Sequence, residues 1–100
     1  MIEAAIICLA LNIYHEARDQ PVLGQIAVSQ VVLNRVNDPR YPNSVCRVVR
    51  QAKYSKKTRQ PIKWECSFSW FCDGKSDKVK DLDAYRWALT LSGRVLRGEF

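Results

Sequence analysis

The sequence predicts a mainly α-helical (α+β) domain of about four helices with one short β-hairpin. Apolar residues recur at helical spacing in three long segments, which favours a helix in each of them. A shorter segment carries an aromatic residue or a cysteine at every second position, which is typical of a strand. The chain has 100 residues, of which 47% are hydrophobic. This length and composition suit a single domain over residues 1–100 with one core.

The first helix is expected to span about residues 2–18. Ile6, Leu9 and Ile13 recur at helical spacing, so one face of this helix should be buried. Glu16 follows on the same side, which predicts a carboxylic acid carried toward an apolar interior. Burial raises the pKa of a carboxyl group, as a general acid requires if it is to hold a proton near neutral pH. Glu16 is therefore a candidate catalytic residue, and the alternative is a solvated charge at a helix end.

A second helix is expected to begin near Val22, because Pro21 disfavours a helical conformation in the residue before it and so ends the first helix. The apolar residues of the second helix cover much more than a narrow stripe. We therefore expect this helix to be central and surrounded by other elements. These residues are Val22, Leu23, Ile26, Ala27, Val31, Val32, Leu33 and Val36.

A turn-rich linker then leads to a short third helix, which Asn43 or Ser44 can cap and which should run through about Ala52. Between residues 50 and 63 the sequence is basic and loses its periodicity, which predicts an exposed loop. This loop is either a solvated surface segment or an anion-contacting lip beside a cleft. Its cations are Arg50, Lys53, Lys56, Lys57, Arg59 and Lys63.

Every even position from Trp64 to Cys72 is aromatic or cysteine, which predicts a strand with one apolar face. Asp73-Gly74 supplies a turn that can close a small hairpin. A final helix is expected over about residues 81–97, with Gly98 placed to end it. The apolar residues expected on one side of that helix are Leu82, Tyr85, Leu89 and Leu96.

The formal net charge of +6 favours an anionic partner, which can be nucleic acid, an acidic membrane surface or an anionic wall polymer. The cysteines lack the spacing of a zinc ribbon, and His15-Glu16 lacks the second histidine of the helical zinc-peptidase pattern. Neither a metal nor another cofactor is expected. In an oxidising compartment some of the cysteines can pair, in a connectivity that the sequence leaves open. They are Cys8, Cys46, Cys66 and Cys72.

Residues 1–14 are rich in apolar residues, but they include Glu3 and lack a basic leader, so no signal peptide is expected there. A membrane-spanning helix needs roughly 18–20 apolar residues, and no stretch of the sequence reaches that length. We therefore expect no transmembrane segment, and the export route stays open.

Five blocks, in order, resemble the SleB-type cell wall hydrolases, the family of spore cortex-lytic enzymes. They are residues 8–18, 24–28, 31–36 and 41–46, and Phe68-Ser69-Trp70 with residues 72–74. The resemblance covers nearly the whole chain, from about Ile7 to Gly98. It implies a lysozyme-like domain that acts in the cell envelope on peptidoglycan glycan strands, as a monomer and without nucleic acid as a partner.

Within this resemblance, Glu16 matches the family's catalytic glutamate. The implied reaction cleaves the glycosidic bond between N-acetylmuramic acid and N-acetylglucosamine, which needs a proton on the leaving oxygen. We hypothesise a lytic transglycosylase, in which the C6 hydroxyl of the muramoyl sugar replaces water as the nucleophile and Glu16 acts as acid and then base. A hydrolase would need a second carboxylate, for which Asp19 and Asp73 are the candidates. Asp19 stands where the family usually has glycine, and Gln20 where it usually has glutamate.

Candidate substrate-binding residues accompany Glu16. Ser69 matches the family's hairpin and is the first of them, while Trp70 either stacks on a sugar or packs in the core. Gln25 is expected to touch substrate, since helical spacing turns Asn34 to the opposite side. His15 is either a hydrogen-bonding group at the edge of the cleft or a structural side chain. The candidate set is Tyr14, His15, Gln25, Ser69 and Trp70.

A second hypothesis belongs to another class of function. The same fold can serve as a non-catalytic module that binds wall polymers or nucleic acid through its basic segment, for which Lys56, Lys57 and Arg59 are the candidates. Members of the family commonly continue past the last helix into a further aromatic and histidine-containing segment. The sequence ends before that segment, so one wall of the cleft can be missing. Three possibilities stay open: a shorter but active form, an excerpt of a longer polypeptide, or a degenerate binding module.

Overall fold

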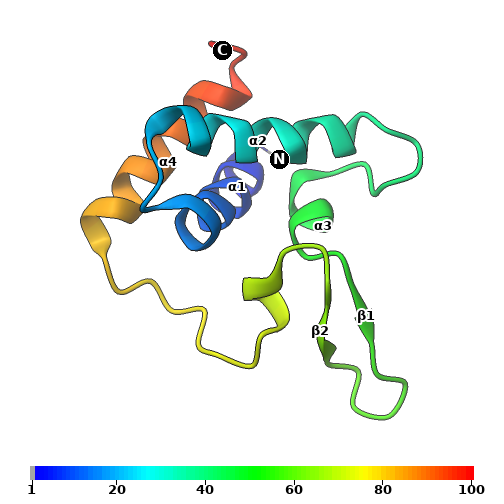
Figure 1. Cartoon of the computed structure of the whole chain (residues 1–100). Coiled ribbons are helices and arrows are strands. Elements are labelled where there is room, and N and C mark those ends of the chain that lie inside the picture. The colour runs from blue at the N-terminus through cyan, green and yellow to red at the C-terminus, as the bar shows by residue number, and fades with distance from the viewer. Residues whose placement is uncertain (1) are drawn as a thin grey trace.

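The computed structural model describes residues 2–100, which form four α-helices, one antiparallel hairpin and one 3₁₀ helix (Figure 1). The prediction of a mainly α-helical fold with a short hairpin is confirmed. In chain order the elements are α1 Ile2–Ala17, α2 Val22–Val36, α3 Val45–Val49, β1 Ala52–Tyr54, β2 Pro61–Cys66, η1 Ser69–Cys72 and α4 Leu82–Leu96.

Helix α1 lies at the centre of the domain. The other three helices all pack against it, as Figure 1 shows. Leu9, Ala10 and Ile13 are completely buried. The small side chains of Ala10 and Ala17 are buried as well, which allows neighbouring helices to approach α1 closely. The core of the domain is thus built around the helix that carries Glu16.

The prediction that the second helix is the central one was wrong. Leu23 of α2 is 80% exposed, and Val22 and Val31 also lie at the surface. The buried residues of α2 are Gln25, Ser29 and Val32, which form one narrow row. The width of an apolar surface does not reveal how many other elements pack against a helix. In addition, two of the three buried residues of α2, Gln25 and Ser29, are polar and form hydrogen bonds in the interior.

Helix α3 begins at the predicted cap but is shorter than expected. The Ser44 hydroxyl accepts a hydrogen bond from the backbone N–H of Arg47 at 3.3 Å, which is an N-cap contact. The helix ends at Val49, because the chain then enters strand β1. Its three valines face the core, and they are Val45, Val48 and Val49.

The basic segment is not a loop throughout. Strand β1 pairs with β2 in an antiparallel hairpin whose exposed tip is residues 55–60. The predicted strand over residues 64–72 was therefore wrong beyond Cys66. A disulfide joins Cys66 to Cys72, with a Cα–Cα distance of 6.2 Å. Six residues of extended chain would span about 20 Å, so this segment must turn back, and it does so through η1.

The Asp73-Gly74 pair forms a turn but does not close the hairpin. The Asp73 carboxylate accepts a hydrogen bond from the Lys75 backbone N–H at 2.8 Å, and Gly74 has a φ of +78°. This left-handed conformation suits glycine. The turn starts an irregular segment, residues 73–81, which returns the chain to α4 (Figure 1).

Helix α4 occupies the predicted position and ends before Gly98, which has a φ of +79°. Its buried face differs from the predicted stripe, because Leu82 is 60% exposed. The helix packs on α1 through small side chains, and the Ser92 hydroxyl donates a hydrogen bond to the Ile6 carbonyl at 2.8 Å. The buried residues of α4 are Ala88, Leu91, Ser92, Gly93 and Val95.

Two disulfides account for all four cysteines. Cys8–Cys46 joins α1 to α3, and Cys66–Cys72 joins the end of β2 to η1. One bridge thus fixes the central helix, and the other closes the segment between the hairpin and the helical core. Within residues 2–100, every helix is too short or too polar to cross a membrane.

The two bridges should contribute unequally to stability. They close spans of 38 and 6 residues, for which the chain-entropy model gives about 4 and about 2 kcal/mol. Cys8→Ala with Cys46→Ala should therefore lower the free energy of unfolding more than Cys66→Ala with Cys72→Ala. Urea unfolding of both double variants, compared with the unmodified protein, measures the difference. A larger loss from the short-span variant would contradict this ranking.

Candidate active site

Glu16 lies in the last turn of α1, and its side chain is exposed. The expectation that Glu16 shares the buried face is therefore wrong. Ala17 continues the buried row that includes Leu9 and Ile13, whereas Glu16 is turned by about 100° from Ala17. This rotation places the carboxyl at the edge of the buried face, where solvent can reach it.

The surroundings of Glu16 favour its protonated form. Partial burial of the carboxyl raises its pKa above the ordinary 4.5, while the charge of His15 acts in the opposite direction. The negative end of the α1 dipole also disfavours a carboxylate in this turn. An exposed carboxyl whose pKa is raised can both hold a proton and deliver it to a bound molecule.

Trp70 fixes η1 to the same side of α1. Its Nε1 donates a hydrogen bond to Asn12 Oδ1 at 2.9 Å, and both side chains are buried. Its ring stacks on His15, with ring centroids 4.6 Å apart. Asn12 lies one helical turn before Glu16, so η1 adjoins the side of α1 on which Glu16 lies. Trp70 is thus a core residue, while Ser69 is exposed at the start of η1.

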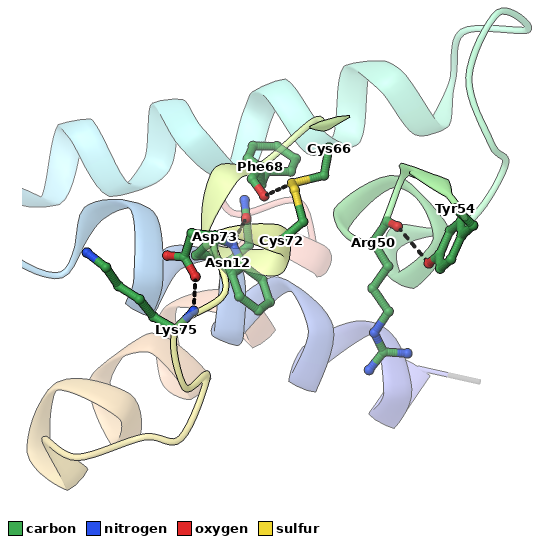
Figure 2. Close-up of a disulfide and its surroundings, with 9 residues drawn as sticks. Asn12, Arg50, Tyr54, Cys66, Phe68, Cys72, Asp73 and Lys75 are labelled. Atoms are coloured by element: carbon green, nitrogen blue, oxygen red, sulfur yellow. Dashed lines mark hydrogen bonds between the residues drawn. A yellow bond between two sulfur atoms is a disulfide. The ribbon is translucent and has the colours of Figure 1, made fainter. Parts of the chain in front are cut away.

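The Cys66–Cys72 disulfide holds the ends of the segment that carries Ser69 and Trp70, and Figure 2 shows it beside Asn12. The Phe68 carbonyl oxygen lies 2.9 Å from the Cys66 sulfur. Since a disulfide sulfur carries no hydrogen, this is a packing contact and not a hydrogen bond. The bridge and the Trp70 contacts together determine where Ser69 lies.

Residues 73–81 pass over the C-terminal end of α1 and are held there by two side chains. The Tyr14 hydroxyl accepts hydrogen bonds from the backbone N–H groups of Asp81 at 2.9 Å and Lys80 at 3.1 Å, and these bonds lower the Tyr14 pKa. His15 Nε2 lies 3.1 Å from the Asp77 carbonyl oxygen, to which it donates in its Nε2–H tautomer. Tyr14 is only 1% exposed, so it positions this segment from within the core.

Gln25 is engaged at both ends of its amide. Its Nε2 donates to the Ala17 carbonyl at 3.2 Å, and its Oε1 accepts from Trp87 Nε1 at 2.7 Å. The residue is 4% exposed. Gln25 therefore links the end of α1 to α4 and is poorly placed for the substrate contact expected of it. Asn34 is exposed elsewhere on α2.

The structure brings Glu16, His15, Ser69 and Trp70 to the C-terminal end of α1. Asn12 was missed, although a polar residue in an apolar stretch four positions before Glu16 was a usable signal. Asp77 was also missed, because its approach depends on the path of an irregular segment. Its pKa is raised mainly by burial, while His15 lowers it and Asp73 raises it.

The candidate second carboxylates lie outside the helix that carries Glu16. Asp19 is exposed in the turn after α1, and Asp73 lies in the turn after η1. Among residues 2–100, His15 is the charged group that shifts the Glu16 pKa, and no acidic side chain does so. The arrangement can supply one proton donor, flanked by a polar and aromatic surface.

Comparison with known proteins identifies relatives. The model of the Cell Wall Hydrolase family matches residues 19–99, beginning just after Glu16. A spore cortex-lytic enzyme of Bacillus subtilis is 51% identical over 41 residues, which are 41% of this chain and 13% of that protein. Those of Halalkalibacterium halodurans and Bacillus cereus are each 46% identical over 41 residues, which are 41% of this chain and 12% and 16% of the relatives. The chain thus spans far less than two thirds of these proteins. No solved structure matches it significantly.

The raised pKa of Glu16 should make stability depend on pH. Since the folded protein holds this proton more tightly than the unfolded chain, the stabilisation is full at low pH. It is lost as pH rises from 4.5 through the folded-state pKa. Glu16→Gln should remove this loss. The melting temperature of the variant, relative to that of the unmodified protein, should therefore increase as pH rises over this interval.

Thermal unfolding of both proteins across that pH interval measures the effect. Asp77→Asn is a parallel test, because burial also raises the Asp77 pKa. Removing this carboxyl should likewise reduce the loss of stability as pH rises. An unmodified protein whose stability falls no more than that of Glu16→Gln would contradict the raised pKa.

Proposed function

The chain belongs to the cell wall hydrolase family, and on this basis we propose that it cleaves peptidoglycan glycan strands with Glu16 as the proton donor. The observation that carries the proposal is the environment of Glu16. Its carboxyl is exposed, has a raised pKa and projects from the end of the central, buried helix. A rigid element thus presents an acid with a raised pKa to the surface.

The bond to be cleaved joins N-acetylmuramic acid to N-acetylglucosamine. Its leaving oxygen needs a proton as the bond to the anomeric carbon breaks. Glu16 supplies that proton and becomes a carboxylate. The charge of nearby His15 stabilises this carboxylate, because it acts to lower the Glu16 pKa.

We assign the second half of the reaction to a lytic transglycosylase route. The Glu16 carboxylate takes the proton from the C6 hydroxyl of the muramoyl sugar, and the C6 oxygen bonds to the anomeric carbon. The product carries a 1,6-anhydro end, and Glu16 regains its proton. This route uses Glu16 alone, first as acid and then as base. It needs no second carboxylate.

The other candidate residues divide into two groups. Ser69 and the edge of His15 are proposed to touch the glycan, because Ser69 is exposed and His15 is partly so. Tyr14, Gln25 and Trp70 are proposed to position the site, since their polar groups bond to protein. We place the activity in the cell envelope, where the two disulfides can persist.

Replacement of Glu16 tests the reaction. Glu16→Gln should lower the release of soluble fragments from peptidoglycan by at least about 10²–10⁴-fold, the usual contribution of general acid–base catalysis. Mass spectrometry of the products should show anhydro-muropeptides with the unmodified protein alone. Asp19→Asn is the matched control, since it removes a nearby exposed carboxylate and should leave the products unchanged.

Two other outcomes would contradict this proposal. Reducing-end fragments would reject the transglycosylase route and make Asp19 and Asp73 the carboxylates to test. Undiminished release by a folded Glu16→Gln variant would reject Glu16 as the acid.

A specific observation also favours wall-polymer binding as a second function. Lys56, Lys57 and Arg59 are exposed at the hairpin tip, and no ion pair is found for them among residues 2–100. Unpaired cations at an exposed tip suit contact with an anionic polymer. This function is compatible with cleavage at Glu16.

Neutralising the tip tests this binding. In the Glu16→Gln background, which raises the formal net charge from +6 to +7, changing Lys56, Lys57 and Arg59 to Gln lowers it to +4. It should weaken binding to walls that carry anionic polymers and flatten its salt dependence. The control changes Arg40, Arg86 and Arg97 to Gln, which removes equal charge from cations already paired with carboxylates. An equal loss of wall binding in both variants would show a net-charge effect and exclude a binding site at the tip. Nucleic acid is the alternative ligand to test in the same way.

A further inference from the structure

Trp64 in strand β2 combines a strained backbone with an exposed side chain. Its φ is +67°, in the left-handed region that bulky residues rarely adopt. Such a conformation costs roughly 1–3 kcal/mol. The residue is 61% exposed, so core packing does not offset this cost. A strained residue that gains little from burial points to a role at the surface.

The hairpin register accounts for the position of Trp64. Ala52 pairs with Cys66 and Tyr54 pairs with Pro61, so two steps along β1 oppose five steps along β2. The additional residues of β2 make a bulge that includes Trp64. Bulges redirect side chains out of the regular alternation of a strand. The indole is thereby aimed away from the core.

Trp64 lines a groove of about 380 Å³ that runs across both strands. The other side chains of this Trp64 groove are mostly polar and include an amide, an ammonium, a carboxylate and a hydroxyl. Lys63 Nζ lies 5.5 Å from the centroid of the Trp64 ring and helps to hold it. The lining residues are Gln51, Ala52, Lys53, Trp64, Glu65, Cys66 and Ser67.

The charges of the lining favour a neutral ligand. Lys53 Nζ lies 3.9 Å from Glu65 Oε1 across the two strands, so the two charged side chains offset each other. The Ser67 hydroxyl donates to Gln51 Oε1 at 3.3 Å, which leaves the Gln51 amide N–H₂ able to donate to a ligand. An aromatic face beside neutral donors and acceptors suits a molecule with one apolar face and a polar rim.

A sugar ring has this character, since its C–H groups form an apolar face and its hydroxyl and acetamido groups surround that face. We propose that the Trp64 groove is a glycan-binding subsite for an N-acetylated sugar, distinct from the Glu16 site. The proposal rests on the function proposed above, because its ligand is a unit of the same glycan strand. From Ser67 the chain continues into η1, where Trp70 stacks on His15, the neighbour of Glu16 in α1.

Binding to the Glu16→Gln variant tests the subsite without turnover. The probes are a hexamer of N-acetylglucosamine and glycan strands freed of their peptides. The chain has three tryptophans, so three indole N–H resonances can be followed by NMR and assigned by substitution. The Trp64 resonance should shift with either probe, and Trp64→Ala should weaken binding roughly two- to tenfold.

Two further variants separate binding from folding. Trp64→Gly keeps a residue that accepts a φ of +67°, so it should fold with at least unchanged stability while its binding weakens as much as in Trp64→Ala. Tyr54→Ala is the matched control, because Tyr54 is an exposed aromatic residue of the same hairpin that does not line this groove. It should bind both probes as Glu16→Gln alone does.

The outcomes separate the two proposals. Full affinity in Trp64→Gly, or a Trp64 resonance that saturating probe does not shift, would overturn the subsite and leave cleavage by Glu16 standing. Two results together would support the subsite and overturn the proposed reaction. They are binding that depends on Trp64 and release of no peptidoglycan fragments by the unmodified protein.

Discussion

The burial of α1 is the constraint on which the rest of the structure depends. Three helices pack against it, and Cys8–Cys46 joins it covalently to α3. Each fully buried residue such as Leu9 or Ile13 contributes about 1.5–3 kcal/mol. A helix held on several sides has little freedom to rotate or slide, so the core itself determines where its last turn ends. Glu16 thus inherits a defined position although its own side chain is exposed.

The non-helical part of the chain depends on few contacts with that helix. Residues 67–81 bury the side chains of Phe68, Trp70 and Cys72. Polar contacts with α1 also hold them: Trp70 to Asn12, His15 to Asp77, and Lys80 and Asp81 to Tyr14. A buried hydrogen bond such as Trp70–Asn12 is strengthened by its low-dielectric surroundings. The Asn12 amide N–H₂ group has no partner within residues 2–100, which carries a cost of about 1–3 kcal/mol. Asn12 is therefore better explained by the orientation it gives Trp70 than by stability.

The sequence allowed the helices to be placed because their apolar spacing, the Ser44 cap and Gly98 are local signals. It did not identify the central helix, since the apolar residues of α2 resemble those of a buried helix while Leu23 is exposed. Alternation from Trp64 to Cys72 indicated a strand, and the Cys66–Cys72 bridge makes that strand impossible. For the site, the position of Glu16 in the last turn of a helix was predictable, but its exposure was not. Its contacts with η1 and with residues 73–81 depend on pairings between distant parts of the chain.

The proposed acid and the proposed binding residues therefore lie on elements of different rigidity. The acid is on a helix fixed by the core, whereas Trp64 and the basic tip are on a two-stranded hairpin, which is marginally stable by itself. The Cys66–Cys72 bridge and the Trp70 hydrogen bond to Asn12 join the hairpin to the helix. For the glycan strand of the proposed reaction, a rigid junction would hold the Trp64 groove and Glu16 in a fixed arrangement. We propose that the small covalent loop around η1 serves this alignment as well as stability.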